Sequence, residues 1–177
     1  MVKIGVLADT HIPRRAKEVP RFVIEKLQGA ALIIHAGDLT DMRVIDQLAK
    51  VAPVEAVAGN IDSEDVREKL PRQRLITVGG YSIGVVHGDG TSGTTIQRAR
   101  RAFGDKGPDC IVFGHSHIPL IQYLDGVLMV NPGSPTDPRR QQMPSFAIIT
   151  VGDKIDAEII YFDRNSPVKM IYATAQN

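Results

Sequence analysis

The sequence predicts an α/β protein with two β-sheets, and two observations support this fold class. Across residues 3–60, short apolar runs alternate with helical patterns, which indicates parallel βαβ units whose sheet is covered on both faces. From residue 74 onward, strand-like runs come in pairs around Gly-containing turns, which indicates hairpins and a second, mostly antiparallel sheet. A chain of 177 residues is long enough to bury one core, so we expect a single domain over residues 1–177.

The first third of the chain supplies three strands and two helices. Pro20 suits the first turn of one helix and Gly29 its end, while Thr40 or Asp41 suits the N-cap of the other. The strands are expected over residues 3–8, 31–36 and 54–58. The helices are expected over residues 20–29 and 41–51.

The remainder of the chain supplies three hairpins and one helix. The helix is expected over residues 95–104, and residues 163–177 are interpreted as a weakly structured tail or an added terminal segment. The hairpins are expected over residues 74–88, 120–130 and 146–162. Their turns are Gly79-Gly80, Asp125-Gly126 and Gly152-Asp153.

The composition argues against several classes of protein. A formal net charge of +1 lacks the single-sign field that non-specific binding to nucleic acid or an anionic membrane requires. No apolar run approaches the ~20 residues of a spanning helix, and the N-terminus lacks a signal-peptide cleavage site, so we expect a cytoplasmic protein without a membrane partner. Cys110 is the only cysteine, so disulfides within the chain are impossible and a buried, inert thiol is expected.

Four of the five histidines lie where a predicted strand ends in a loop, and His35 is the exception. In open α/β sheets, ligands bind at the carboxyl ends of the strands, so polar groups at these ends could converge on one edge. We therefore predict a functional site at this edge. The polar groups are Asp9, His11, Asp38, Asn60, His87, His115 and His117.

The residue types at these strand ends favour a divalent metal. Imidazoles, carboxylates and a carboxamide, without thiolates, suit Mn, Fe, Zn or Co ions better than a structural zinc site. On an extended backbone Asp9 and His11 point the same way, as do His115 and His117, although loop geometry could send the members of a pair to different ions. Two ions ~3.5–4 Å apart, bridged by a carboxylate, would use all of these groups, and such pairs hydrolyse phosphate esters. Asp38 is the expected bridge.

Each of these residues also has a purely structural explanation. Asp9 could cap a helix, Asp38 could lie in a turn, and a single histidine is commonly a hydrogen-bonded structural residue. The glycines beside them could be turn residues. The recurrence of such groups at five successive strand ends favours the functional interpretation.

The order and spacing of these residues resemble the calcineurin-like metallophosphoesterases, whose pattern is D-x-H, G-D, G-N-H-[DE], a later H and G-H-x-H. The NPGS segment that precedes Pro138 and Arg139 is similar to the small single-domain phosphodiesterases of bacteria and archaea. The resemblance implies a four-layer α/β/β/α sandwich of two mixed sheets. The matching segments are DTH at 9–11, GD at 37–38, GNID at 59–62, HG at 87–88 and GHSH at 114–117.

The resemblance further implies two divalent metal ions per chain, with Mn expected first and Fe, Zn, Ni or Co as alternatives. Asp38 would bridge the ions, and Asp38, Asn60 and His115 are expected to carry the catalysis, by in-line attack of a metal-bridging hydroxide on phosphorus. The implied ligands are Asp9, His11 and His117 for one ion and Asn60, His87 and His115 for the other.

One position departs from the family pattern. Residue 61 is isoleucine where the phosphatases carry a histidine near the leaving oxygen, and Ile61 can neither donate a proton nor stabilise charge. We therefore expect a preference for phosphodiesters with good leaving groups, or else water or another side chain that supplies the proton. Asp62 is adjacent and either reaches the substrate or caps the helix that follows it.

Two arginines are candidates for binding the substrate phosphate. Arg139 matches the pattern of the small branch and Arg14 follows the first ligand pair, and either could hold a phosphate through two hydrogen bonds. His35 is expected to be a packed, hydrogen-bonded strand residue or a neighbour that supports the metal ligands. A solvated face is expected of the arginines on the predicted helix, Arg98, Arg100 and Arg101.

The sequence therefore predicts a metal-dependent phosphodiesterase that acts on a small phosphate ester. One alternative is a metal-binding scaffold for protein interactions, which the fold also serves in eukaryotic trafficking, although scaffolding does not require every ligand position to be retained. The other is a nuclease or nucleotide phosphatase, with nucleic acid only as a substrate, and the lack of a basic stripe counts against it. Exposed hairpin strands could pair two subunits into a homodimer.

Overall fold

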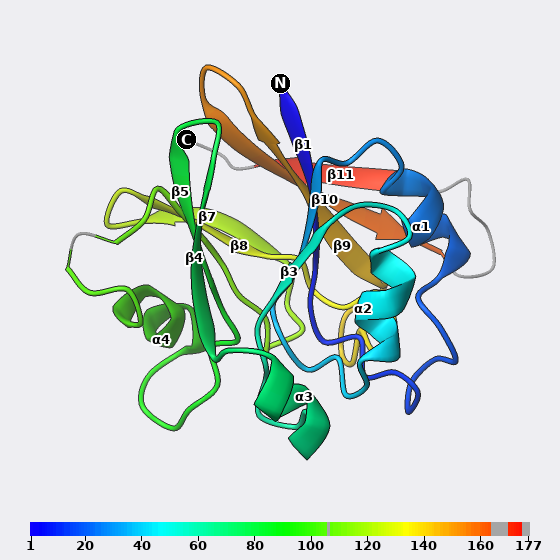
Figure 1. Cartoon of the computed structure of the whole chain (residues 1–177). Coiled ribbons are helices and arrows are strands. Elements are labelled where there is room, and N and C mark those ends of the chain that lie inside the picture. Colours follow the sequence, from blue (N-terminus) through cyan, green and yellow to red (C-terminus); the bar gives the residue numbers. More distant parts are fainter. Residues whose placement is uncertain (106, 164–169, 175–177) are drawn as a thin grey trace.

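Two mixed β-sheets form the centre of the structure, a computed structural model that describes residues 1–105, 107–163 and 170–174 (Figure 1). The first sheet contains β1 (Val2–Leu7), β2 (Leu32–His35), β3 (Val54–Ala56), β9 (Ser145–Val151), β10 (Ile155–Phe162) and β11 (Met170–Thr174). The second contains β4 (Gln73–Val78), β5 (Tyr81–Val86), β6 (Cys110–Val112), β7 (Leu120–Leu124) and β8 (Val127–Asn131). The helices are α1 (Arg21–Lys26), α2 (Arg43–Leu48), α3 (Glu64–Lys69) and α4 (Thr95–Arg101).

The first three strands pair in parallel, as the alternation of strand and helix predicts. Ile4 of β1 lies opposite Leu32 of β2, and Ile33 of β2 lies opposite Val54 of β3. The helices α1 and α2 form the crossovers between them. Parallel pairing requires such crossovers, because a hairpin turn cannot return the chain in the same direction.

The hairpin of β9 and β10 corrects one expectation about the sheets. The sequence assigned it to the second sheet, but β9 pairs antiparallel with β1 of the first, with Ile149 opposite Ile4. Six of the seven β9 residues are buried, which is the burial of a central strand with both faces covered. The second sheet is also mixed rather than mostly antiparallel, because β6 pairs in parallel with both β5 and β8.

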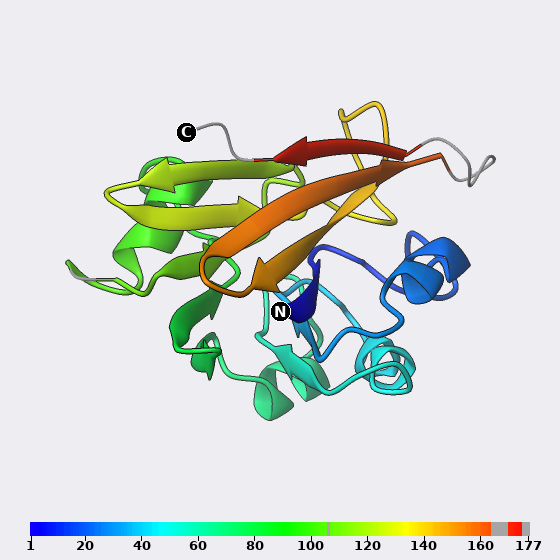
Figure 2. The ribbon, with the colours of Figure 1, turned by 90° about the horizontal axis from the view of Figure 1, so that it is seen from above.

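The sheets and helices form the four layers of an α/β/β/α sandwich. Apolar side chains from both sheets meet between them, including Val6, Ile34, Val85 and Val130. A second cluster packs α1 and α2 on the outer face of the first sheet, and a third packs α4 on the second sheet (Figure 2). Burial of each such side chain contributes about 1.5–3 kcal/mol to folding, so the central cluster fixes how the sheets face each other.

The helix ends differ in detail from the expected caps. Pro20 is the N-cap residue of α1, but α2 begins after Met42, and neither Thr40 nor Asp41 is its N-cap. Asp41 instead accepts a hydrogen bond from the backbone N–H of Arg43. None of the helices in the described ranges is long and apolar enough to cross a membrane.

The C-terminal segment contains a strand. Within residues 163–177, for which a weakly structured tail or an added terminal segment is expected, β11 pairs antiparallel with β10 at the edge of the first sheet. The backbone groups of β11 are therefore part of the sheet. The remainder of the predicted tail, apart from Asp163, lies outside the described residues.

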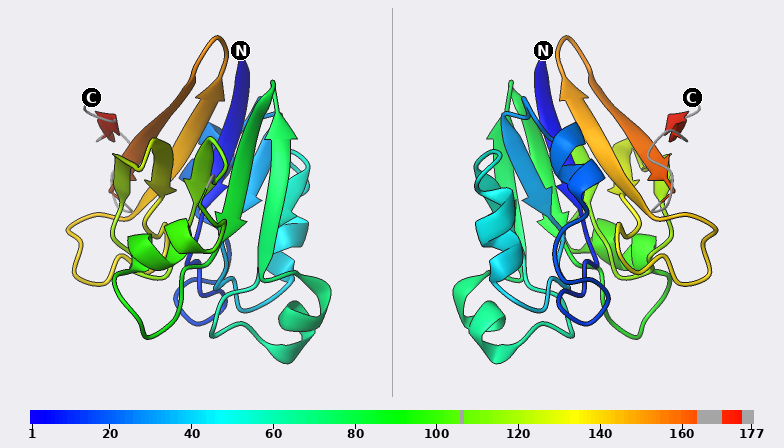
Figure 3. Two further views of the ribbon diagram at one scale, coloured as in Figure 1. Left: turned by 90° about the vertical axis from the view of Figure 1, so that its left-hand side faces the viewer. Right: turned by 90° about the vertical axis from the view of Figure 1, so that its right-hand side faces the viewer.

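The carboxyl ends of five strands meet at one end of the sandwich. In Figure 3 the loops gather at the end opposite the N-terminus. Backbone hydrogen bonds join the segments that follow adjacent strands: Asp9 N–H to Gly37 O, Val57 N–H to His35 O, and Gly114 N–H to His87 O. The predicted convergence of these strand ends is therefore present, and it brings the polar groups of both sheets together.

Candidate metal centre

Most of the predicted ligand residues have an unusual backbone conformation. Positive φ angles occur at Asp9 (54°), His11 (46°), Asp38 (56°), His115 (67°) and His117 (59°). A positive φ is uncommon for residues with a side chain, and such conformations cluster at ligand-binding sites because the surrounding structure must hold them. The prediction of an extended backbone for the pair Asp9 and His11 and for the pair His115 and His117 is therefore wrong.

The seven predicted ligand residues converge, and six of them divide into two groups. Within each group, one potential ligand atom from each residue lies within 4.8 Å of the others. The pair Asp9 and His11 stays together, whereas His115 and His117 separate into different groups. The groups are Asp9, His11 and His117, and Asp38, His87 and His115.

Asp38 lies between the two groups. Its Oδ2 atom is 3.0 Å from Nε2 of His87 in its own group and 3.7 Å from Nε2 of His11 in the other. Asn60 adjoins the second group, because its Oδ1 lies 3.1 Å from Nδ1 of His115. One carboxylate thus faces imidazoles of both groups, which is the arrangement that a bridging ligand needs.

Three of the four histidines in the two groups are buried, and each points its Nε2 atom toward the carboxylates of the centre. Nδ1 of His87 donates to Ala36 O at 2.8 Å, and Nδ1 of His117 donates to Asp137 O at 2.5 Å, because a carbonyl can only accept. Nδ1 of His11 lies 3.1 Å from Oδ2 of Asp137. Within the described residues, the three Nε2 atoms and both carboxylate oxygens of Asp9 are buried without hydrogen-bond partners.

These unpartnered atoms fit a cation. Buried polar groups are normally hydrogen-bonded, and a set of neutral imidazole nitrogens and carboxylate oxygens around one point can be satisfied together by a divalent ion. Asp9 is not a helix cap, the structural role that the sequence also allowed, because its buried carboxylate accepts no hydrogen bond from a helix. The residues present therefore fit the metal ions that the ligand pattern implies.

Burial and neighbouring charges shift the pKa values of the groups in the centre in different directions. Burial raises the pKa of Asp9 to about 7, although His87 and His11 oppose this. Burial alone would lower the pKa of His87, but the carboxylates of Asp38 and Asp9 outweigh it and raise the pKa to about 9. Burial lowers the pKa of His117 to about 4, which keeps that imidazole neutral and able to bind a metal.

Two glycines of the motifs are needed for close approach rather than for a turn. A Cβ atom on Gly59 would lie 2.0 Å from Oδ1 of Asp38. A Cβ atom on Gly114 would lie 2.8 Å from Oδ2 of Asp9. Neither residue has a positive φ, so the space taken by a side chain is what excludes other residues here.

Asp62 does not reach toward a substrate and does not cap α3. Its side chain is buried and accepts hydrogen bonds from the backbone N–H groups of Asp38 at 3.0 Å, Gly59 at 2.6 Å and Thr40 at 2.5 Å. Ser63 is the N-cap residue of α3. Asp62 therefore ties together the two loops that carry Asp38 and Asn60, a role that sequence reasoning missed.

The NPGS segment also supports the centre. Asn131 donates to Gly114 O at 2.9 Å and so fixes the loop before His115. Ser134 donates to Asp9 O at 2.8 Å. The sequence shows the NPGS segment directly after a predicted strand, which could have indicated a supporting role. Its side chains bind backbone atoms far away in the chain, so residue spacing does not predict which atoms they bind.

The structure places the predicted arginines in different surroundings. Arg139 lies near the first group, with its Nε 3.9 Å from Oδ2 of Asp137, whereas Arg14 is exposed and makes no contact with the centre among the described residues. Arg15, the neighbour of Arg14, does approach the centre, with its Nε 3.3 Å from Oδ2 of Asp137. The solvated face expected on α4 is wrong for Arg100, which is buried and donates to Gly104 O.

Three further predictions concern residues around the centre. Arg98 is anchored rather than free, because its Nε donates to Gly88 O at 2.8 Å, directly after His87. His35 is a packed strand residue, as expected. Its Nε2 lies 3.0 Å from the hydroxyl of Thr10, the residue between Asp9 and His11 in the sequence. Cys110 is buried in β6, and burial raises the pKa of its thiol.

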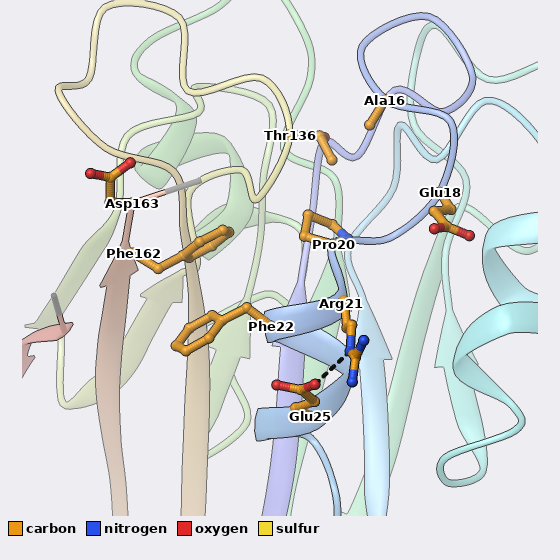
Figure 4. Close-up of a pocket in the computed structure, with 9 residues that line it drawn as sticks. All are labelled: Ala16, Glu18, Pro20, Arg21, Phe22, Glu25, Thr136, Phe162 and Asp163. Atoms are coloured by element: carbon orange, nitrogen blue, oxygen red, sulfur yellow. Dashed lines mark hydrogen bonds and ion pairs between the residues drawn. The ribbon is translucent and has the colours of Figure 1, made fainter. Parts of the chain in front are cut away.

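A cavity of about 550 Å³ lies beside α1 and contains none of the predicted ligands (Figure 4). Phe22 and Phe162 form its apolar part, and Arg21 pairs with Glu25 at its edge. Thr136, which also lines the cavity, directly precedes Asp137 of the metal centre. Carboxylates line this cavity, but none of them belongs to the metal centre, and no histidine among the described residues lines it.

Comparisons with known proteins identify relatives over most of the chain. The model of the calcineurin-like phosphoesterase superfamily domain matches residues 2–154. A probable metallophosphoesterase of Methanothermobacter thermautotrophicus is 41% identical, over 89% of this chain and 91% of that protein. A phosphodiesterase of Methanocaldococcus jannaschii is 27% identical, over 75% and 83%. The crystal structure of Vps29 from Chaetomium thermophilum matches with a TM-score of 0.83 at 23% identity, over 99% of both chains.

Proposed function

Because the chain belongs to the calcineurin-like phosphoesterase superfamily, we propose that it is a phosphodiesterase that uses two divalent metal ions. The carboxylate of Asp38 between the two ligand groups is the observation that carries this proposal. One carboxylate facing two sets of metal-binding atoms is expected of a dinuclear site and has no use in a mononuclear one. The phosphodiesterase among the relatives supports the reaction class.

Each residue has a proposed role in holding the ions. When bound, the ions would activate water as the nucleophile and offset the charge on the phosphate. Asp38 would contact both, and Asn60 would bind through its carboxamide oxygen. The remaining ligands are Asp9, His11 and His117 for one ion and His87 and His115 for the other.

The balance of charge suits an anionic ester. Asp9 and Asp38 are the only carboxylates in the two groups, so two divalent ions would leave the centre positive. Asn60 supplies an oxygen ligand without adding a third negative charge. His115, the least buried of the four histidines in the groups, is the one best placed to contact the ester oxygen as well.

Ile61 favours diesters over monoesters. It follows Asn60 directly, the residue is 38% exposed, and its backbone N–H donates to Oδ1 of Asp38. An alkyl group cannot protonate a leaving alkoxide, so the reaction should depend on leaving groups that depart without a proton. Arg139 is the proposed contact for the phosphate, with Arg14 as the weaker candidate.

Mn²⁺ is the ion we propose first. The donors are imidazole nitrogens, carboxylate oxygens and a carboxamide oxygen, without thiolates, and Fe, Zn, Ni or Co ions are the alternatives for such a set. The substrate proposed is a small phosphate ester. A homodimer through the edge strands, where Leu75 of β4 and Tyr123 of β7 are exposed, stays a prediction.

The test is hydrolysis of an aryl phosphodiester and of the matching monoester by metal-stripped protein reloaded with Mn²⁺. We expect diester turnover that requires the metal and is lost in Asp38→Asn and His115→Ala. Both variants should first be shown to be folded by circular dichroism. Absence of turnover in protein that binds two ions would overturn the proposal and favour a protein-interaction scaffold.

A further inference from the structure

Asp137 lies behind the first ligand group and contacts two of its histidines, although no sequence motif predicted a role for it. Its carboxylate is mostly buried, and Oδ2 lies 3.1 Å from Nδ1 of His11. The same atom is 4.0 Å from Nδ1 of His117, whose Nδ1 donates to the backbone oxygen of Asp137 at 2.5 Å. One residue thus faces the outer nitrogen of both histidines in this group.

His117 is hydrogen-bonded to the backbone oxygen of Asp137, whereas the carboxylate faces Nδ1 of His11 at ion-pair distance without forming a hydrogen bond. Both contacts place an acceptor at the outer nitrogen and so favour Nε2 as the metal ligand. An imidazole whose Nδ1–H faces an acceptor is fixed in rotation and keeps the lone pair on Nε2. The Nε2 atoms of His11 and His117 both point into the centre, and both lack hydrogen-bond partners in the described part of the chain. Outer acceptors of this kind are commonly worth 10–100-fold in metal affinity.

The two ligand groups differ in how their histidines are held. The outer nitrogen of His87 in the second group is anchored by the backbone oxygen of Ala36, and Nδ1 of His115 lies beside Asn60 rather than Asp137. Removal of the Asp137 side chain should therefore affect one group and spare the other.

The position of Asp137 is itself fixed by the loop that carries it. The Ser134 hydroxyl accepts from the backbone N–H of Asp137 at 2.8 Å and donates to Asp9 O, also at 2.8 Å. Arg15 and Arg139 approach the carboxylate from the solvent side, at 3.3 Å and 3.9 Å. These two cations offset the cost of burying the negative charge.

We infer that Asp137 is a positioning residue that sets the affinity of the ion held by Asp9, His11 and His117. This inference rests on the proposed dinuclear function. Asp137 touches neither substrate nor metal in this role and acts through the two imidazoles, on His11 mainly through its carboxylate and on His117 mainly through its backbone oxygen. It gives the two ions different affinities that depend on different residues.

The experiment measures bound Mn²⁺ per chain by atomic emission after dialysis against a series of free Mn²⁺ concentrations. We expect the wild-type protein to bind two ions, and Asp137→Ala to need about 10–100-fold more free Mn²⁺ for one of them. Asp137→Asn keeps the size of the side chain and an acceptor oxygen, so its loss should be smaller. Asp65→Ala removes an exposed carboxylate paired with Lys69 and should match the wild type.

A double-mutant cycle assigns the affected ion. In a His87→Ala background, which weakens the second group, Asp137→Ala should remove the remaining tight ion. In a His11→Ala background it should have little further effect. Similar additional losses in both backgrounds would mean that Asp137 supports the fold in general and would overturn the inference.

Two further results separate this inference from its premise. Wild-type protein that binds two ions, with Asp137→Ala and Asp137→Asn binding both as tightly, would overturn the role of Asp137 and leave the dinuclear site intact. Wild-type protein that binds fewer than two ions would overturn the proposed function and this inference with it. Arg15→Gln should leave both ions bound, because the imidazoles keep their acceptor; loss of one ion there would assign the effect to the arginine instead.

Discussion

Gly59 lies so close to Asp38 that a Cβ atom on residue 59 would be 2.0 Å from Oδ1 of the carboxylate. A methyl group cannot occupy that space, so Gly59→Ala should displace Asp38 from between the two ligand groups. We expect at least a tenfold loss of Mn²⁺ affinity and about 1–3 kcal/mol of stability, measured by titration and by urea unfolding. Gly152→Ala is the control, since its Cβ would meet only the exposed Met1 side chain. Unchanged metal affinity in Gly59→Ala would contradict the assigned role of Asp38.

Asp62→Ala should destabilise the protein even without metal. Its carboxylate accepts from the buried backbone N–H groups of Asp38 and Gly59, and each buried donor left without a partner costs about 1–3 kcal/mol. We expect a total loss of about 3–5 kcal/mol by urea unfolding of the metal-free protein, and a smaller loss for Asp62→Asn, which keeps one acceptor oxygen. The exposed Asp65→Ala should change stability by less than about 0.5 kcal/mol. An equally small effect at Asp62 would show that these loops are held by other contacts.

The parts of the fold and site that depend on local pattern could be predicted from the sequence. Apolar runs separated by helices predicted parallel strands in a sheet that is covered on both faces. Potential metal ligands at the carboxyl ends of successive strands were therefore expected at one edge of the sheet. The grouping of His115 and His117 could not be predicted, because it depends on positive φ angles that extended-backbone reasoning excludes. Strand β9 joined the first sheet through pairing with β1, a contact between distant parts of the chain that local periodicity does not encode.

The residues that support the ligands were missed for a similar reason. Asp62 was interpreted as a group that reaches the substrate or caps a helix, because an acid before a helical pattern has that local explanation. Its actual partners are the backbone N–H groups of three other loop residues, Asp38, Thr40 and Gly59. Asp137 lies 126 positions after His11, so no spacing rule connects them. Such contacts exist only once the loops have converged.

Metal affinity should rise with pH. In the metal-free protein, the Asp38 and Asp9 carboxylates outweigh burial and raise the pKa of His87 to about 9, and burial raises that of Asp9 to about 7. Both groups must lose their protons to bind an ion, so proton release should fall from about two per chain near pH 6 to about one half at pH 9 and nearly none above about pH 10. Calorimetry of Mn²⁺ binding in two buffers of different ionisation enthalpy counts these protons. A release that does not vary with pH would exclude His87 and Asp9 as ligands.

The stability of the metal-free protein should change in the opposite direction. The raised pKa of His87 contributes stability that is fully present below its ordinary value of 6.5 and is lost as the pH rises through about 9. The raised pKa of Asp9 likewise means that its ionisation destabilises the fold between the ordinary value of 3.8 and about 7. Urea unfolding with and without Mn²⁺ should therefore show a stabilisation by metal that grows from pH 6 to pH 9. A constant difference would contradict this linkage.

Arg139→Gln and Arg14→Gln form a matched pair for the substrate site. Arg139 lies beside Asp137 at the first ligand group, whereas Arg14 is exposed and makes no contact with the centre among the described residues. We expect Arg139→Gln to raise KM for an aryl phosphodiester about tenfold with little change in kcat, because a lost ground-state contact weakens binding uniformly. Arg14→Gln should leave both constants within about twofold of the wild type. The reverse ranking would move the phosphate contact to the loop after His11.

Ile61→His should change which esters the protein hydrolyses. The backbone N–H of Ile61 donates to Oδ1 of Asp38 at 3.0 Å, so residue 61 is held beside the proposed bridge. The residue is 38% exposed, so a histidine can replace it without disturbing the core. An imidazole there could protonate a leaving oxygen, an effect worth about 10²–10⁴ in rate for poor leaving groups. We expect the ratio of monoester to diester kcat/KM to rise at least tenfold, and more for alkyl than for aryl leaving groups. Ile61→Leu, which alters shape without adding a proton donor, should leave the ratio unchanged. If Ile61→His also left it unchanged, the missing histidine would not explain a preference for diesters, and the size of the pocket around the ester would have to be tested instead.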